Sequence, residues 1–281
     1  MMEIIRVPRI MREISKELKL KGKSIGFVPT MGALHDGHLS LVKRAKEEND
    51  IVVVSIFVNP IQFAPGEDYE RYPRNLETDK EKLESIGIDY LFLPDVKSLY
   101  QEGYATYVIV EDLSEKLCGR FRPGHFRGVA TVVCKLFNII RPVRAYFGQK
   151  DYQQSLIIKR MVEDLNFDIE IIVCPTVREQ DGLAMSSRNT YLNEKERKAA
   201  TIIYKALQEA EKLLKEGYNP EDVNLKIYEI LKSEPLVKEI QYAGVFDPFT
   251  LEEIKEKQDK YLVAVALKIG DTRLIDNIIV E

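Results

Sequence analysis

Cysteine is scarce in this sequence: the 281 residues include only three, Cys118, Cys134 and Cys174. They are odd in number and far apart, and none belongs to a CxxC pair. Disulfide frameworks and structural zinc sites both need paired, closely spaced cysteines, so the sequence argues against either. We expect each cysteine to be a small buried apolar residue.

Long apolar runs are also missing. No stretch approaches the roughly 20 apolar residues of a membrane span. The N-terminal stretch "MMEIIRVPRIMREISKELKLKGK" carries charges throughout, whereas a signal peptide needs an apolar core. We therefore expect a cytoplasmic protein with no membrane partner.

A basic excess is the third absence. Lys and Arg total 41 against 45 Asp and Glu, which gives a net charge of -4. Proteins that bind nucleic acid usually have a basic region, so nucleic acid is not an expected partner. With 45% hydrophobic residues, 281 residues are enough for one large domain or two ordinary ones.

Apolar runs and amphipathic stretches alternate in the first part of the chain. The strand-like runs "SIGFVPT", "DIVVVSIFVNP" and "IDYLFLPD" are separated by the helix-like stretches "HLSLVKRAKEEN" and "NLETDKEKLESIG". This order predicts a βαβαβ arrangement. Because residues 51–58 are apolar almost throughout, we expect a strand buried on both faces, as in a parallel sheet.

The rest of the chain extends this prediction. A hairpin is expected around "YATYVIVEDLSEKL", followed by helices at "GVATVVCKLFNIIR" and "DYQQSLIIKRMVEDLN" and strands at "AYFGQ" and "FDIEIIVCPT". Residues 1–176 are therefore predicted to form a doubly wound, Rossmann-like parallel-sheet domain. Residues 177–281 contain two helix-like stretches, "NEKERKAATIIYKALQEAEKLLKEG" and "NPEDVNLKIYEILKS", and then three strand-like runs, which predicts a smaller α+β domain.

The stretch "FVPTMGALHDGHLSLVKRA" holds two of the three histidines, His35 and His38, at the start of a predicted helix with Asp36 as its N-cap. In open α/β folds, ligands bind where strands end, and a helix N-terminus offers N–H groups to phosphate. Gly32 and Gly37 would let a nucleotide approach the backbone. Histidines three residues apart share one helix face, so both can donate to phosphate oxygens.

Other interpretations of this stretch stay open on the motif alone. Four-residue patterns are weak, and both histidines could be exposed loop residues. The stretch is not a Walker loop, because no lysine follows the glycines, and the GxGxxG pattern is absent. Two histidines without a neighbouring carboxylate or thiolate offer too few ligands for zinc.

Two further loops carry groups suited to phosphate. "VREQDGLAMSSRNTYL" contains Ser186, Ser187 and Arg188, whose hydroxyls and guanidinium could bind a polyphosphate. A helix N-cap is the alternative for the serines. In "FGQKDYQQ", Lys150 and Asp151 lie at a strand-to-helix turn, where the lysine could neutralise phosphate; a surface ion pair is the alternative.

Two more stretches carry polar side chains. "CGRFRPGHFRGVATVV" surrounds His125 with three arginines, including Arg122. These groups would repel one another unless an anion or an acidic residue lies among them, so either an anionic substrate or a solvated loop is expected. Asn59 and Gln62 follow the apolar strand in "FVNPIQF", and such amides suit contacts to a hydroxyl or carboxylate.

Five motifs together carry a specific resemblance: "PTMGALHDGH", "FVNPIQF", "RPGHFRGV", "FGQKDYQQ" and "DGLAMSSRN", in this order. The chain resembles, over nearly its full length, the pantothenate synthetase family, the pantoate and β-alanine ligases of the nucleotidyltransferase superfamily. This resemblance implies ATP-dependent condensation of pantoate with β-alanine through a pantoyl adenylate, releasing AMP and pyrophosphate. It also implies a homodimer.

The resemblance implies roles for individual residues. His38 would be the proton donor, with His35, Lys150 and Ser186 to Arg188 also acting on the phosphates. The residues expected to bind ATP are Met31, Gly32, Ala33, Leu34, His35, Asp36, Gly37, His38, Gly148, Gln149, Lys150, Asp151, Val177, Met185, Ser186, Ser187 and Arg188. The second domain would close over ATP during the cycle.

Substrate contacts follow from the same resemblance. Gln62 and Gln154 would bind pantoate, with Gln62 also serving β-alanine. The further residues expected near these substrates are Asn59, Arg122 and His125. Mg²⁺ would arrive bridging the ATP phosphates rather than in a protein metal site, with Asp79 at most an indirect partner.

Three other functions remain as alternatives. A nucleotidyltransferase that transfers AMP or CMP to a phosphate-bearing acceptor would share HxGH but would not require "FVNPIQF" and "FGQKDYQQ". An aminoacyl-tRNA synthetase would need a longer chain and a basic anticodon-binding region. A non-catalytic nucleotide sensor would bind ATP without turnover, because a fold can outlive its activity.

Overall fold

The computed structural model describes residues 2–281, which divide into two compact units. The first unit comprises the described part of Met1–Ser114 together with Arg122–Gly148 and Gln154–Pro175. The second comprises Glu115–Phe121, Gln149–Gln153 and Thr176–Glu281. Two short segments from the first two-thirds of the chain thus belong to the same unit as the C-terminal part.

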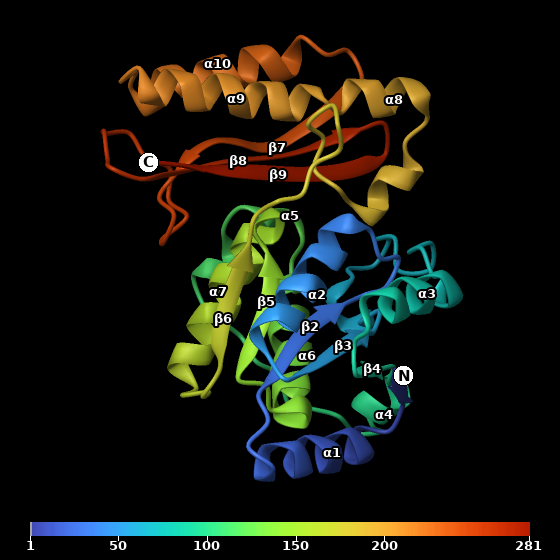
Figure 1. Ribbon diagram of the computed structural model, residues 1–281. Coiled ribbons are helices and arrows are strands. Elements are labelled where there is room, and N and C mark those ends of the chain that lie inside the picture. Colours follow the sequence, from blue (N-terminus) through green and yellow to red (C-terminus); the bar gives the residue numbers. More distant parts are fainter. Residues whose placement is uncertain (1) are drawn as a thin grey trace. The chain divides into compact units, whose positions relative to one another are not determined.

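The first unit is built on a six-stranded sheet (Figure 1). Its strands are β1 (Glu3–Ile5), β2 (Ile25–Thr30), β3 (Ile51–Ile56), β4 (Tyr90–Phe92), β5 (Arg144–Gly148) and β6 (Glu170–Cys174). They run in the order β1-β4-β3-β2-β5-β6, and all five pairings are parallel. The predicted parallel sheet is confirmed. Strand β1 was not foreseen, because three residues are too few to show a pattern.

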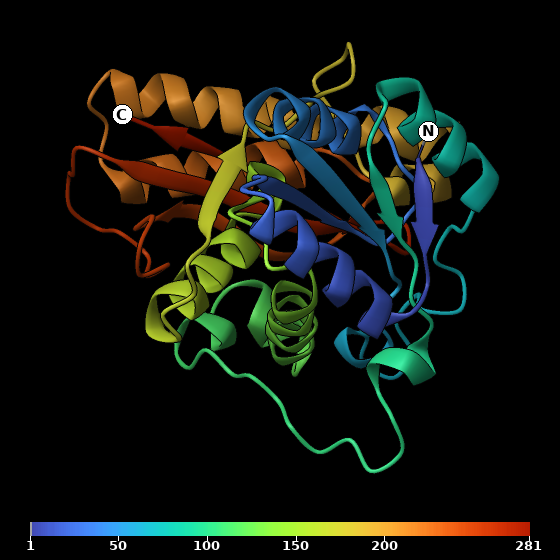
Figure 2. The same ribbon diagram turned by 60° about the horizontal axis from the view of Figure 1, so that its bottom comes forward.

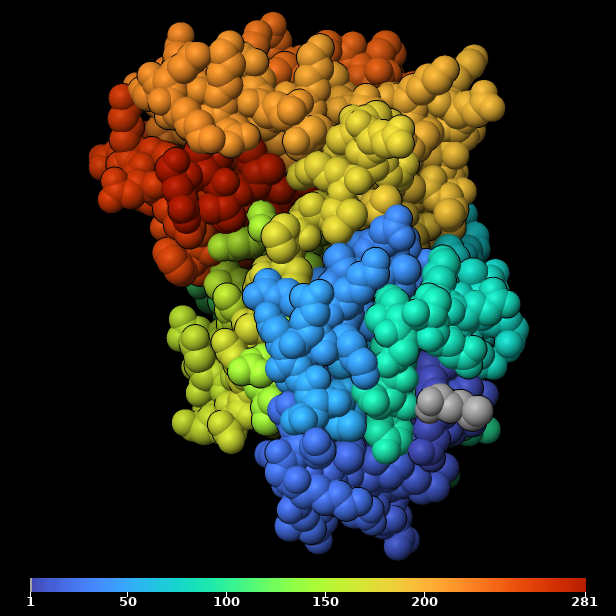
Figure 3. All heavy atoms as spheres, viewed as in Figure 1, coloured from blue at the N-terminus to red at the C-terminus, as the bar shows by residue number. Residues whose placement is uncertain are grey.

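Helices cover both faces of this sheet. They are α1 (Pro8–Leu20), α2 (Asp36–Glu48), α3 (Leu76–Ile86), α4 (Val96–Leu99), α6 (His125–Ile140) and α7 (Tyr152–Asp164). Neighbouring strand residues point to opposite faces. Thus Val28 packs in one core with Leu41 and Val42 of α2, whereas Phe27 contacts Phe137 of α6 edge-on. Helices α2 and α3 lie side by side on the surface shown in Figure 3.

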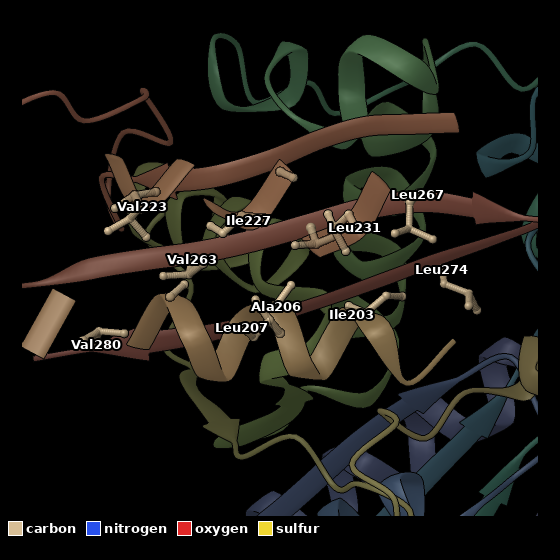
Figure 4. Close-up of a cluster of buried hydrophobic side chains, with 14 of the residues drawn as sticks. Ile203, Ala206, Leu207, Val223, Ile227, Leu231, Val263, Leu267, Leu274 and Val280 are labelled. Atoms are coloured by element: carbon tan, nitrogen blue, oxygen red, sulfur yellow. The ribbon is translucent and has the colours of Figure 1, made fainter. Parts of the chain in front are cut away.

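The second unit contains an antiparallel three-stranded sheet of β7 (Val237–Phe246), β8 (Tyr261–Ile269) and β9 (Thr272–Val280). Its helices are α5 (Cys118–Phe121), α8 (Glu194–Ala199), α9 (Ile202–Lys215) and α10 (Pro220–Lys232). Apolar side chains of α9 and α10 meet those of the sheet in one buried core (Figure 4). The expected pairing of a parallel-sheet region with a smaller C-terminal α+β region is confirmed.

The expected hairpin in residues 104–117 is wrong. Residues 104–110 run as a loop without a partner strand, between turns at residues 102–103 and 111–112, which Figure 2 shows after α4. The backbone N–H of Val108 donates to Thr131 Oγ1 instead of to a strand. The ring of Tyr107 stacks under Arg127 of α6, 3.6 Å from ring centroid to guanidinium carbon. Tyr107 and Ile109 are exposed and only Val110 of residues 104–110 is buried, so this apolar stretch does not pair as a hairpin.

Two smaller expectations also need correction. The stretch predicted as one helix across residues 193–217 is two helices, α8 and α9, because Thr201 and Ile203 form tight backbone hydrogen bonds to residues three positions earlier. All three cysteines are free thiols, but only Cys118 and Cys174 are buried and Cys134 is half-buried. No helix within residues 2–281 is long and apolar enough to cross a membrane.

Candidate functional site

The HxGH stretch lies where β2 ends and α2 begins. The N-cap of α2 is His35, not Asp36 as expected; Asp36 is the first helical residue. The two imidazole centroids are 4.1 Å apart, so the rings are neighbours although His35 lies just outside the helix. The backbone N–H of His35 donates to His38 Nδ1 at 3.4 Å. In the neutral ring the hydrogen therefore sits on His38 Nε2, which makes that atom a donor suited to a phosphate oxygen.

A buried carboxylate holds the loop before these histidines. Asp79, 2% exposed on α3, accepts hydrogen bonds from the backbone N–H groups of Ala33 at 2.8 Å and Leu34 at 2.7 Å. Both Gly32 (φ 82°) and Ala33 (φ 50°) have left-handed backbones, which cost energy at a residue with a Cβ. Lys82 Nζ also donates to the carbonyl of Leu34. Asp79 thus stabilises a strained turn that sets the start of α2.

The amide of Gln62 has its orientation fixed by its neighbours. Asn59 Nδ2 donates both to the carbonyl of Gly128 and to Gln62 Oε1, each at 3.0 Å, and Asn59 Oδ1 accepts from the hydroxyl of Tyr100 at 2.9 Å. The Gly128 carbonyl can only accept a hydrogen bond, so the Asn59 atom that faces it is the NH₂ nitrogen. The same nitrogen faces the Gln62 amide, so the Gln62 atom nearest to it must be the oxygen. Gln62 therefore presents its NH₂ group, which lies 3.2 Å from Met31 Sδ.

Asn59 is buried beside Gln62, the other amide expected near the substrates. It is 1% exposed, and its amide is engaged by Gln62, Gly128 and Tyr100. Burial raises the pKa of Tyr100, which keeps its hydroxyl protonated as a donor. The geometry therefore gives Asn59 the part of orienting Gln62.

Arg122 lies beside an acidic residue. Its guanidinium forms two parallel hydrogen bonds to the carboxylate of Glu67, at 2.7 and 2.8 Å. A third nitrogen, Nη1, lies 3.0 Å from His125 Nε2, and His125 Nδ1 lies 2.8 Å from the carbonyl of Gln62. Since arginine only donates and a carbonyl only accepts, His125 carries its hydrogen on Nδ1 and is neutral. An acidic residue does lie beside this arginine-rich loop, as considered above, because Glu67 pairs with Arg122.

In the second unit, Lys150 and Asp151 lie in the 3-10 turn η3 (Gln149–Asp151), which follows β5 in the chain. Lys150 Nζ is 4.0 Å from Asp151 Oδ1, so the two form a loose ion pair whose side chains are 20% and 47% exposed. Asn277 Nδ2 donates to the carbonyls of Gln149 and Lys150. The turn is thus held from β9.

The Ser186 to Arg188 stretch opens the 3-10 helix η4 (Ser187–Tyr191). Ser186 is its N-cap and accepts from the backbone N–H of Arg188, so the capping role considered for the serines is present. The backbone N–H of Met185 donates to the carbonyl of Val177 at 3.0 Å, which brings two expected ATP residues together.

An ion-pair network supports the segment before η4. Asn189 Nδ2 donates to Glu179 Oε1 at 3.0 Å. Arg197 donates to Glu179 and, through two nitrogens, to Asp181. Hydrogen bonding from Arg197 lowers the pKa of Asp181, so this carboxylate stays charged at neutral pH. Hydrogen bonds and ion pairs from Asn189 and Arg197 therefore hold the segment on which Ser186 to Arg188 lie.

The expected site residues are distributed over both units. Those in the first unit are Met31–His38, Asn59, Gln62, Arg122, His125, Gly148 and Gln154; those in the second are Gln149–Asp151, Val177 and Met185–Arg188. Gln154 is half-buried on α7. A Cβ at Gly148 would meet no heavy atom within 4 Å, so packing does not require a glycine there. Within residues 2–281 no group of three or more His, Cys, Asp or Glu could hold a metal ion.

Several residues of these networks are not recognisable from the sequence. They are Glu67, Tyr100 and Asn277, with Asp79 expected only as an indirect partner. Each lies far along the chain from the group it contacts, and none belongs to a recognisable motif. Only the folded chain brings them to the site residues.

The family model of pantoate-beta-alanine ligase matches residues 3–279. A curated pantothenate synthetase from Thermodesulfovibrio yellowstonii is 80% identical over 280 residues, covering 100% of both chains. Among solved structures, a pantothenate synthetase from Thermus thermophilus has a TM-score of 0.93 and 45% identity, covering 98% of both chains. A pantoate-beta-alanine ligase from Francisella tularensis, complexed with beta-gamma ATP and beta-alanine, has a TM-score of 0.82 and 39% identity, covering 99% of this chain and 97% of its own.

Proposed function

Because this chain belongs to the pantoate-beta-alanine ligase family, we propose that it joins (R)-pantoate to β-alanine through a pantoyl adenylate. The enzyme is an ATP-dependent ligase of pantothenate biosynthesis. A carboxylate oxygen of pantoate attacks the α-phosphorus of ATP, and pyrophosphate leaves. The amine of β-alanine then attacks the acyl carbon, loses a proton, and AMP leaves. Adenylation turns a poorly reactive carboxylate into an acyl group with a good leaving group.

The orientation of Gln62 is the observation that best supports this substrate. Pantoate offers a carboxylate and hydroxyl oxygens, and a side-chain NH₂ with a fixed direction suits such acceptors. Gln62 is 8% exposed and is held by Asn59 through its side chain and by His125 through its carbonyl. The same amide serves β-alanine, and Gln154 contributes a second amide to pantoate. His125 holds the backbone carbonyl of Gln62, and Arg122 holds His125, so both residues position Gln62 beside the substrates.

The phosphate groups of ATP are bound by the cationic and hydroxyl groups of the motifs. His38 Nε2–H donates to a phosphate oxygen and is the proton donor, with His35 beside it at a ring distance of 4.1 Å. Lys150 and the Ser186 to Arg188 segment neutralise the charge that develops on the leaving pyrophosphate. Asp151 and Val177 contact the nucleoside, and Gly148 leaves room for it.

The two parts of the chain divide this work. Residues 1–176 bind the nucleotide and pantoate, and residues 177–281 close over ATP once it is bound. The working form is a homodimer, which light scattering of the purified protein would test. The enzyme works in the cytoplasm, where ATP is made; its three free thiols fit a reducing compartment.

Magnesium accompanies ATP rather than occupying a protein cage. Residues 2–281 offer no cluster of metal ligands, and both carboxylate oxygens of Asp79 accept backbone hydrogen bonds. Mg²⁺ commonly keeps several waters and binds substrate phosphates with few protein ligands, so these residues are compatible with it. When bound, the ion would neutralise phosphate charge. Chelation should abolish adenylation and leave the fold unchanged.

ATP–pyrophosphate exchange tests the proposal. The purified enzyme is assayed with magnesium, with and without pantoate, and in the absence of β-alanine. Exchange that requires pantoate establishes the adenylate. ATP binding without exchange at any pantoate concentration would contradict the proposal and favour another acceptor or a nucleotide sensor.

A further inference from the structure

Two neighbouring residues of β9, Asp276 and Asn277, hold two different loops. Adjacent strand residues point to opposite faces of a sheet, so their side chains reach different parts of the second unit. The Asp276 carboxylate accepts two hydrogen bonds from Arg178, which directly follows Val177. The side chain of Asp276 is 2% exposed and that of Arg178 is 17% exposed.

Asn277 reaches the other loop. It is 4% exposed, and its Nδ2 donates to the carbonyls of Gln149 at 3.0 Å and Lys150 at 2.9 Å. A side-chain atom that faces two carbonyl oxygens must be the NH₂ group, so the direction of this amide is settled. Both hydrogens of Nδ2 are used to hold one turn of backbone.

The two loops share one proposed role, since Gln149, Lys150 and Val177 are all proposed contacts of ATP. We propose that Asp276 and Asn277 are positioning residues for ATP: together they set the spacing between the Gln149–Asp151 turn and the loop at Val177. Neither side chain needs to touch the nucleotide. This inference rests on the proposed function, because it assumes that both loops bind ATP.

The chemistry of the pair fits positioning better than stability alone. A buried ion pair is a weak source of stability, because desolvation offsets much of its attraction. A bidentate arginine contact, by contrast, fixes direction and distance. Burial raises the pKa of Asp276, while the charges of Arg178 and Lys150 oppose that rise.

The decisive variant is Asn277→Asp, which keeps the shape but places a carboxylate oxygen against the two carbonyls. Repulsion should displace the turn, raise the KM for ATP in pyrophosphate exchange about tenfold, and leave the KM for pantoate within about twofold. Asn138→Asp makes the same chemical change at an exposed site on α6 and should alter neither constant. Asp276→Asn and Asn277→Ala provide milder changes should the first variant fail to fold.

Calorimetric titration of ATP into each folded protein completes the test. Weaker ATP binding in the β9 variants, with pantoate KM retained, supports the inference. Unchanged ATP affinity, or equal rises in both KM values, overturns it and leaves a purely structural role. A wild type that binds ATP without exchange rejects the proposed reaction only, whereas a wild type that binds no ATP rejects both.

Discussion

Asp79 Oδ2 accepts a hydrogen bond from the backbone N–H of Ala33 at 2.8 Å, across 46 positions of the chain. Its second oxygen accepts from Leu34. One buried carboxylate thus satisfies two backbone donors in a turn that contains a left-handed alanine. The HxGH histidines begin directly after this turn, so their direction depends on a residue outside the motif.

Replacing Asp79 with asparagine should destabilise the protein by about 1–3 kcal/mol, because the NH₂ group would face a backbone donor inside the protein. The free energy of unfolding from denaturant titration measures this. Glu84→Gln, on an exposed part of the same helix, is the matched control and should change stability by less than about 0.5 kcal/mol. Equal effects of both changes would show that Asp79 does not hold the turn.

His38→Ala should reduce the adenylation rate about 10²-fold or more, because it removes a donor to the transition-state phosphate. The fold should stay intact, since His38 lies in the first turn of α2 at its partly exposed end. Single-turnover formation of the adenylate measures the effect, with ATP affinity determined in parallel. A wild-type rate in this variant would remove His38 from the catalytic residues.

Tyr100→Phe removes the hydroxyl that donates a hydrogen bond to Asn59 Oδ1. Asn59 Oδ1 would then lose its donor inside the protein, and the Asn59 amide would hold Gln62 less firmly. We expect the KM for pantoate to rise about 3- to 10-fold with the KM for ATP unchanged, since one hydrogen bond is worth about 1 kcal/mol. Tyr107→Phe, whose ring stacks under Arg127, is the control. A rise in both KM values would point to general loosening instead.

Gly128→Ala tests how closely α6 approaches Gln62. A Cβ at this position would lie 2.5 Å from Gln62 Cα and from the carbonyl oxygen of Ile61, and backbone atoms cannot rotate away. The variant should lose about 1–3 kcal/mol of stability and should also bind pantoate more weakly. Thermal denaturation and pantoate KM report the two effects. Wild-type values for both would mean that the helix shifts without moving Gln62.

Asp50 should make the protein sensitive to acid. Hydrogen bonds from the backbone and hydroxyl of Ser24, together with Lys23, lower its pKa to about 2. The unfolded value is about 3.9, so the charged form stabilises the folded state above about pH 4, and this contribution is lost as the pH falls toward 2. The Asp50→Asn variant should not show this loss of folding stability at low pH. Urea titrations between pH 5 and 2 check this, and parallel stability curves for the two proteins would contradict it.

Local pattern determined much of the fold. The apolar runs now seen as residues 25–30 and 51–56 predicted strands, and the unbroken run at residues 51–58 predicted burial on both faces, because a strand inside a parallel sheet has no exposed face. The position of HxGH at a strand-to-helix junction follows from the same local pattern. The apolar run at 104–110 was misleading, because its residue types are those of a strand, whereas the folded chain gives it no partner strand and leaves Tyr107 and Ile109 exposed.

The sequence by itself determined the fold class, the family and the motif residues, since these depend on short-range periodicity and on residue order. Tertiary structure decided how those residues are held: Glu67 is 55 positions from Arg122, and Asn277 is 128 positions from Gln149. A hydrogen bond depends on distance and direction in space, and no local pattern encodes which distant side chain will supply it. The orientation of the site side chains is therefore set only when the chain folds.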